Sequence, residues 1–330
     1  MAKSIRCTSA RQSTESLDDL PTDINQENCK RRGLCLVGKD RSNVPYRLYY
    51  EIHGSLDGSN KMVHRLNNTC NSWDNQVDHF AKKPDHSVLV FDNRGVGNSE
   101  TGVREKYKTS EMAKDALELL NFLGWDKERS LHIIGVSMGG MIAQELCLLI
   151  PERVRSVAFV STKAGDKFDL PPLSGLYMLS RLITGTVTEE QRIEYFLNCL
   201  FPQHFLDQPH SEGFTQREHY RRIFTRRFKT VRPQTTAGRL GQLGAALGHS
   251  CSVFKLKWMN EKLHPAKILV IGGDEDKLIN PVRIYELHDF LSGSELVMIK
   301  GAGHALGAQV KDQFNETIER IMQEADQIFS

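Results

Sequence analysis

The stretch HIIGVSMGGMIAQEL, residues 132–146, places a serine between two glycines where an apolar run gives way to a helical pattern. A serine on a sharp turn between a strand and a helix has a strained backbone that leaves room only for small neighbours, and Gly135 and Gly139 meet that demand. The helix after Ser137 directs backbone N–H groups and its positive end toward the site, where a developing oxyanion needs them. The stretch predicts a nucleophilic serine; the alternative is a glycine-rich turn without a catalytic role.

Short apolar runs alternate with helical patterns from Tyr46 onward, which is typical of a parallel sheet flanked by helices. Amphipathic helices are expected over residues 110–124 and 141–154. The expected strands are residues 46–52, 60–63, 87–92, 131–136, 154–162, 267–273 and 294–304. The alternation predicts an α/β fold.

Between Thr162 and Lys267 the alternation stops, and only helical patterns divided by proline and glycine remain. A crossover between two strands rarely needs so long a connection, so we expect an inserted helical subdomain. The expected parts are a polar N-terminal tail, a first part of the core, a helical cap insertion and a second part of the core. They span residues 1–40, 41–163, 164–262 and 263–330, respectively.

The composition of the 330 residues, with 39% hydrophobic and 25% charged residues, indicates an ordinary globular protein. A formal net charge of +2 gives no overall attraction for nucleic acid or an anionic membrane, and no apolar stretch is long enough to span a bilayer. We therefore expect a small-molecule partner. The oligomeric state is not predicted.

The seven cysteines are scattered and include no Cys-x-x-Cys pair, which argues against a disulfide framework and a zinc site. Reduced thiols of this kind are typical of a cytoplasmic protein. Residues 1–14 are basic, rich in serine and free of acidic side chains, so mitochondrial import is the alternative. Neither a metal nor a cofactor is expected.

Three further motifs accompany the serine turn: DNRGVGNS at residues 92–99, GGDEDKLINP at 272–281 and GAGH at 301–304. Together the four motifs resemble those of α/β-hydrolases that use a Ser–acid–His triad, and the resemblance runs from about Tyr46 to the C-terminus. It implies the α/β-hydrolase fold, a mostly parallel central sheet flanked by helices, with an inserted helical cap. Within the family the chain resembles small esterases, enol-lactone hydrolases and cofactor-free haloperoxidase-like enzymes. Ser137 argues against haloalkane dehalogenases and epoxide hydrolases, because the related enzymes carry aspartate at this position.

A serine hydroxyl attacks an acyl carbon only when a base takes its proton and an acid orients that base. His304 is the candidate base, because it follows an expected strand among small residues that leave an imidazole room to reach across the strand ends. The resemblance places the acid on a loop between Ser137 and His304. Asp276 is favoured because DKLINP is similar to the family's Asp-x-apolar-apolar-x-Pro, and Asp274 and Asp166 are the alternatives.

The oxyanion hole is where the sequence departs from the family pattern. That pattern is His-Gly-x with a tryptophan further along, and the x residue donates a backbone N–H to the oxyanion. Here His64 and Trp73 keep the spacing, but Arg65 stands where glycine is usual. The resemblance makes Leu66 one donor and Met138, the residue after the nucleophile, the other. A side chain at a position that often needs unusual dihedrals costs about 1–3 kcal/mol of strain or displaces the loop.

The motifs predict a serine hydrolase that cleaves a carboxylic ester, lactone or similar acyl bond through an acyl-serine intermediate. Asp92 and Arg94 are expected to be structural. We expect a small, partly apolar acyl substrate, and the basic stretch 217–229 fits a solvated helix face or, alternatively, an anionic ligand. The alternative functions are acyl transfer with the same triad, or a ligand-binding receptor or scaffold with weak or no turnover, which Arg65 favours.

Overall fold

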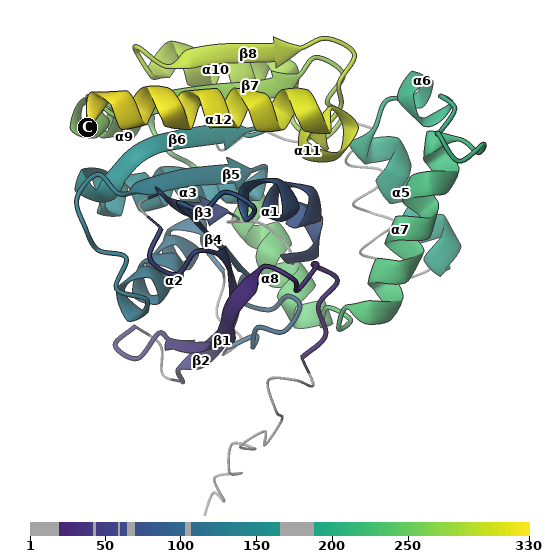
Figure 1. The fold of residues 1–330 in the computed structure, drawn as a ribbon, viewed down its shortest axis with the longest axis horizontal. Helices are drawn as coiled ribbons and strands as arrows, with labels where there is room; N and C mark the ends of the chain where they lie inside the picture. The colour runs from purple at the N-terminus through teal and green to yellow at the C-terminus, as the bar shows by residue number, and fades with distance from the viewer. Residues whose placement is uncertain (1–19, 42–43, 59, 65–69, 103–106, 166–187) are drawn as a thin grey trace, which may run out of the picture.

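The structure is a computed structural model that describes residues 20–41, 44–58, 60–64, 70–102, 107–165 and 188–330 (Figure 1). These residues form an eight-stranded sheet in the order β1-β2-β4-β3-β5-β6-β7-β8. The strands are β1 (Cys29–Val37), β2 (Tyr46–Gly54), β3 (Asn60–His64), β4 (His86–Phe91), β5 (Leu131–Val136), β6 (Val154–Val160), β7 (Lys267–Gly273) and β8 (Glu295–Ile299). β2 is antiparallel to β1 and β4, and every other pair is parallel. The predicted mostly parallel central sheet is confirmed.

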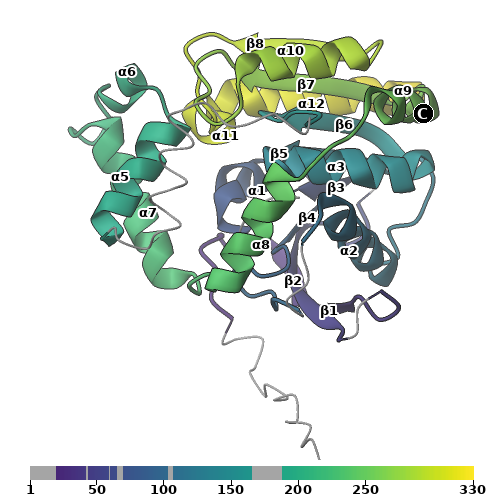
Figure 2. The same ribbon diagram turned by 180° about the vertical axis from the view of Figure 1, so that it is seen from behind.

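Helices cover both faces of the sheet (Figures 1 and 2). These helices are α1 (Asp74–Phe80), α2 (Thr109–Phe122), α3 (Met138–Leu149), α9 (Val253–Leu263), α10 (Pro281–Phe290) and α12 (Lys311–Ile328). α2, α3, α9 and α10 pack into one apolar cluster, and α1 and α12 pack into a second. No helix in the described part of the chain is long and apolar enough to cross a membrane.

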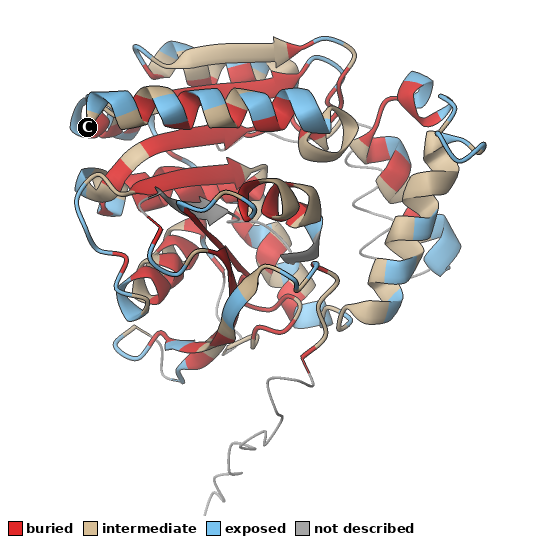
Figure 3. Ribbon diagram, in the orientation of Figure 1, coloured by how far each residue is buried: buried red, intermediate tan, exposed pale blue. Residues whose placement is uncertain are grey.

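The strands supply both clusters, because successive side chains of a strand point to opposite faces of the sheet. In β4, Leu89 and Phe91 belong to the first cluster, and Val88 and Val90 belong to the second. Figure 3 shows the resulting burial of the central strands. Burial on both faces explains why these strands read as continuous apolar runs in the sequence.

Three helices, α5 (Glu189–Leu200), α6 (Gln203–Leu206) and α7 (Gln216–Thr230), form a separate layer at the side toward which the parallel strands run (Figure 1). Thr188 begins α5 with a capping box: its hydroxyl accepts from the N–H of Gln191, whose side chain accepts from the N–H of Thr188. The layer has an apolar cluster of its own, which includes Ile193, Leu197, Phe201, Phe205 and Leu206. We call these three helices the cap.

Two helices within the expected cap, residues 164–262, pack on the core instead. α9 buries Leu256, Met259 and Leu263 completely in the first core cluster. α8 (Thr236–Leu247) lies near α3, and its Gln242 amide donates to the carbonyl of Arg94 at 3.0 Å. The described cap is therefore smaller than the sequence suggested, because helical periodicity reports an apolar face and not the layer against which that face packs.

The expected tail, residues 1–40, also differs from the structure in its second half. Leu20 and Ile24 are buried in the second core cluster, and Cys29–Val37 forms the edge strand β1. The charged first half of β1, CKRRG, faces solvent over much of its length and hides the alternation that begins at Leu34. A charged edge strand of this kind is common because it discourages pairing with other chains.

Candidate active site

Ser137 lies on the turn between β5 and α3, with φ 56° and ψ −124°. A non-glycine residue with positive φ costs roughly 1–3 kcal/mol and persists only where its surroundings fix it. Two hydrogen bonds hold this backbone: the Ser137 N–H donates to the carbonyl of Val160 at 2.9 Å, and Thr162 Oγ1 donates to the carbonyl of Ser137 at 2.7 Å. Both partners belong to the end of β6 and the residues just after it. The neighbouring strand therefore imposes the strained turn.

Glycine is required at two positions around Ser137 by close contacts with neighbouring atoms. A Cβ on Gly135 would lie 2.4 Å from the carbonyl oxygen of Gly139, and one on Gly140 would lie 2.5 Å from Thr162 Cγ2. The close approach of α3 to β5 and β6 thus excludes side chains at both positions. The need at Gly135 was predicted, whereas the one at Gly140 was missed, because it depends on a neighbouring strand remote in sequence.

Asp276 and His304 come together at the carboxyl edge of the sheet. Asp276 follows β7 and His304 follows β8, and these strands are parallel neighbours, so both loops emerge at the same edge. His304 Nδ1 lies 2.7 Å from Asp276 Oδ2, and each residue is only 5% exposed. The other oxygen, Oδ1, accepts from the N–H groups of Leu278 and Ile279 at 2.8 and 2.9 Å. A carboxylate only accepts, so the shared proton sits on Nδ1 and leaves Nε2 as the basic nitrogen.

Ser137 reaches this edge at the end of β5, with β6 between it and β7 in the sheet. The carboxyl ends of parallel strands are where α/β sheets bind their ligands. The structure thus brings the three predicted triad residues to one edge and places two of them in direct contact.

The alternative acid Asp274 has a different partner. Its side chain is exposed, and Oδ1 accepts from the N–H of Gly301 at 2.7 Å. Asp166, the other alternative, lies outside the described residues. Among the described carboxylates, Asp276 is the one that contacts His304.

Of the two predicted oxyanion donors, Met138 is described. It is the first residue of α3, where backbone N–H groups have no acceptor within the helix. Leu66 and Arg65 lie outside the described residues. The role of Leu66 as an oxyanion donor, and the effect of Arg65 on it, therefore stay predictions.

The loop that carries Asp92 and Arg94 is held by contacts within the protein. Asp92 Oδ2 accepts from the N–H of Asn98 at 2.8 Å, and the guanidinium of Arg94 forms a buried ion pair with Asp115 at 2.6 Å. These contacts are those of structural residues, in line with the role expected for both.

The cap contacts the loops that carry Asp276 and His304. The N–H of Ala305 donates to the carbonyl of Leu200 at 3.2 Å, and the Tyr220 hydroxyl donates to the carbonyl of Ala308 at 2.8 Å. On the acid loop, Lys277 Nζ donates to the carbonyl of Asn198 at 3.1 Å. Sequence reasoning missed these contacts, since they join segments with no shared pattern.

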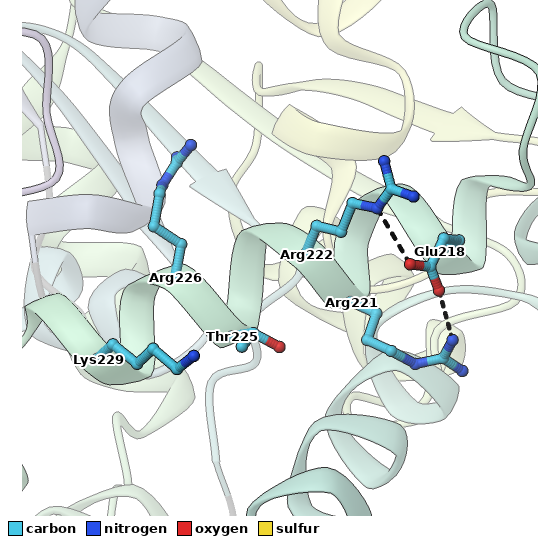
Figure 4. Close-up of a pocket in the computed structure, with 6 residues that line it drawn as sticks. All are labelled: Glu218, Arg221, Arg222, Thr225, Arg226 and Lys229. Atoms are coloured by element: carbon cyan, nitrogen blue, oxygen red, sulfur yellow. Dashed lines mark hydrogen bonds and ion pairs between the residues drawn. The ribbon is translucent and has the colours of Figure 1, made fainter.

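A groove of about 410 Å³ runs along the outer side of α7 (Figure 4). It is lined by Glu218, Arg221, Arg222, Thr225, Arg226 and Lys229. Glu218 forms ion pairs with Arg221 and Arg222, which lower the pKa of its carboxyl, and Arg226 pairs with Asp23. Because acidic neighbours take up these arginines, the basic stretch fits the solvated helix face better than an anion site.

One group of described residues has the donor types of a metal site. Ligand atoms of Cys29, Glu51 and His53 all lie within 4.8 Å of one another. The Glu51 carboxylate is already engaged, because it accepts from His53 Nε2 at 2.7 Å, Gln26 Nε2 at 3.0 Å and the Tyr49 hydroxyl at 2.8 Å. Burial raises the pKa of Glu51, but the hydrogen bonds from His53 and Gln26 outweigh burial and leave the pKa below its usual value. We interpret the group as a buried carboxylate with its own set of donors.

A family model described as alpha/beta hydrolase fold matches residues 52–308, and the chain belongs to this family. A putative carbamate hydrolase RutD from Agrobacterium fabrum is 24% identical over 298 residues, covering 85% of this chain and 100% of the relative. An uncharacterized carboxylesterase nap from Bacillus subtilis is 26% identical over 274 residues, covering 82% and 77%. The match to a putative carbamate hydrolase RutD from Variovorax paradoxus, 29% identical, is shorter and spans 34% of this chain and 42% of that relative.

Among solved structures, the enol-lactonase from Burkholderia xenovorans superposes with a TM-score of 0.67 at 20% identity, covering 87% of this chain and 99% of that one. At this identity the likeness concerns the fold. The predicted α/β-hydrolase fold is confirmed by the family match and by this superposition.

Proposed function

We propose that the protein is a serine hydrolase that cleaves a carboxylic ester, lactone or similar acyl bond through an acyl-serine intermediate. The observation that carries the proposal is the 2.7 Å contact between Asp276 and His304 at the sheet edge where Ser137 occupies its strained turn. A strained nucleophile at the same sheet edge as an oriented imidazole fits the arrangement that acyl transfer needs.

In the proposed mechanism, Ser137 Oγ attacks the acyl carbon while His304 Nε2 accepts its proton. Asp276 keeps the other ring proton on Nδ1 and stabilises the imidazolium that forms. The N–H of Met138, and on the predicted alignment that of Leu66, bind the oxyanion of the tetrahedral intermediate. His304 then protonates the leaving alcohol, and water activated by the same imidazole releases the acid from Ser137.

The proposed substrate is a small, partly apolar acyl compound. The names of the similar proteins, a carboxylesterase, an enol-lactonase and carbamate hydrolases, support acyl chemistry without selecting among esters, lactones and carbamates. We expect no metal or cofactor in this mechanism, because each proton transfer is assigned to a side chain. The described cysteines Cys29, Cys35, Cys147, Cys199 and Cys251 are free, which supports the proposed cytoplasmic location.

A panel of nitrophenyl esters, lactones and carbamates tests this proposal, with Ser137→Ala, His304→Gln and Asp276→Asn as variants. We expect hydrolysis of at least one class, with kcat reduced by about 10³ to 10⁶ in Ser137→Ala and His304→Gln and by about 10⁴ in Asp276→Asn. Product analysis with an added alcohol separates hydrolysis from acyl transfer. Binding of the panel without turnover by the wild-type protein would support the receptor alternative instead.

A further inference from the structure

His304 follows three small residues whose side chains do little to fix the conformation of their loop. The preceding residues Gly301, Ala302 and Gly303 have little or no side chain, and Gly301 has a φ of 69°. Such residues leave the backbone much conformational freedom. The orientation of the imidazole therefore depends on contacts made by residues outside the loop.

The side chain of Gln309 binds this loop at two points. Its Oε1 accepts from the N–H of Gly303, and its Nε2 donates to the carbonyl of Gly301, each at 2.8 Å. A backbone N–H can only donate and a carbonyl can only accept, so the orientation of the amide is fixed by its two partners. A side-chain amide offers both functions in one planar group without any change of protonation. We call this pair of hydrogen bonds from Gln309 to Gly301 and Gly303 the clamp. It ends at Gly303, the residue directly before His304.

Asp274 fixes the same loop from the side of the acid. Its Oδ1 accepts from the N–H of Gly301 at 2.7 Å, and the next N–H, of Glu275, donates to the carbonyl of Ala302 at 2.9 Å. Asp274 is two residues from Asp276, so these bonds join the loop of the acid to the loop of the base. The relative position of Asp276 and His304 follows from this junction.

We propose that Gln309 and Asp274 are positioning residues for His304, which hold its loop so that Nδ1 meets Asp276. The kinetic part of this inference rests on the proposed function, whereas the structural part concerns the Asp276–His304 hydrogen bond itself. Misplacement of a catalytic group by about 1 Å can reduce the rate by about 10²-fold. Loss of the clamp therefore lowers kcat and changes KM little, because neither residue is assigned a contact with substrate.

The first test compares Gln309→Met, which keeps the length of the side chain and loses both hydrogen bonds, with Gln313→Met, an exposed control in the first turn of α12. We expect kcat to fall by about 10 to 10²-fold in Gln309→Met, with KM within about threefold, and neither to change in Gln313→Met. We also expect the downfield proton resonance of His304 Nδ1–H to weaken or broaden in Gln309→Met.

The second test uses Asp274. Because its side chain is exposed, we expect its variants to fold with little loss of stability. Asp274→Ala should reduce kcat and the resonance, and Asp274→Asn should restore both, because asparagine keeps the oxygen that accepts from Gly301. This rescue also separates positioning from catalysis, since the acid of a triad does not tolerate asparagine.

The resonance needs no substrate, so the two proposals fail separately. If wild-type protein shows the resonance but no turnover, the proposed function is wrong, and the resonance of Gln309→Met and Asp274→Ala still decides the positioning inference. If the resonance and kcat persist in both Gln309→Met and Asp274→Ala, the inference is wrong. A fall in kcat with an unchanged resonance also overturns it, because the effect then does not pass through His304.

Discussion

Thr162 donates a hydrogen bond of 2.7 Å from its Oγ1 to the carbonyl oxygen of Ser137, and this bond ties the strained turn to the end of β6. The same side chain closes the space beside Gly140, where a Cβ would lie 2.5 Å from Thr162 Cγ2. The turn is therefore fixed by packing between neighbouring strands as well as by its own sequence.

Substitution of Gly140 by alanine should displace α3 or Thr162, because the added Cβ would lie too close to the Thr162 side chain for both to keep their places. We expect a loss of about 1–3 kcal/mol in the free energy of unfolding, together with a fall in the rate of Ser137 acylation. The matched control is Gly244→Ala on α8, where an added Cβ would meet nothing within 4 Å and alanine should be neutral or stabilising. Denaturant unfolding and burst kinetics measure the two effects. Equal behaviour of the two variants would contradict the packing argument.

The contact between the cap and the short helix α11 (Leu306–Gln309), which follows His304, gives a second prediction. Tyr220→Phe removes the hydroxyl that donates to Ala308 and keeps the ring, so we expect stability to fall by about 1 kcal/mol. Because this bond anchors the cap, KM for the best substrate should rise in the same variant. Tyr285→Phe, at an exposed position on α10, is the control and should change neither quantity. An unchanged KM in Tyr220→Phe would indicate that this bond does not set the cap position.

His249 gives a prediction for the dependence of stability on pH. It is buried beside Thr109 and Gln144, and burial lowers its pKa from 6.5 to about 3. Between these values the unfolded chain binds a proton that the folded chain does not. The buried neutral imidazole therefore leaves the free energy of unfolding unaffected above pH 6.5. Below that pH, it lowers the free energy of unfolding by about 1.4 kcal/mol per pH unit as the pH drops toward 3.

The variant His249→Gln should flatten this part of the pH profile. Urea unfolding of both proteins from pH 7 to 4 measures the difference, and His264→Gln, at an exposed position just after α9, is the control. Parallel profiles for wild type and His249→Gln would show that the folded protein accommodates the charged imidazole.

Arg65→Gly restores the residue that is usual in the family's oxyanion motif. We expect kcat to stay the same or to rise, because glycine meets the backbone demand of this position without strain. Steady-state kinetics of the wild-type protein and Arg65→Gly, on the ester that the wild-type protein hydrolyses fastest, measures this change in kcat. Loss of activity would mean that the alignment placing Leu66 in the oxyanion hole is wrong.

The sequence predicted the central strands and the placement of the candidate residues because both depend on local patterns. Ser137, Asp276 and His304 each follow an apolar run, and parallel strands bring the ends of such runs to one edge. β1 was missed because its charged half masks the alternation, and α9 was assigned to the cap because a helical pattern does not reveal its packing partner.

The clamp by Gln309 illustrates what local patterns omit. A glutamine five residues after a histidine is unremarkable in sequence, and its role arises only when a short helix turns its side chain back onto the loop. The same holds for Thr162 and Gly140, whose contact depends on the closeness of β6 and α3.

The most direct test of the central claim is covalent labelling by a fluorophosphonate, followed by intact mass and peptide mapping. We expect one adduct per chain, located on Ser137, which is lost in Ser137→Ala and kept in Ser161→Ala, the serine just after β6. Folded wild-type protein that takes up no label, or that carries it on a residue other than Ser137, would contradict the assignment of Ser137 as the nucleophile.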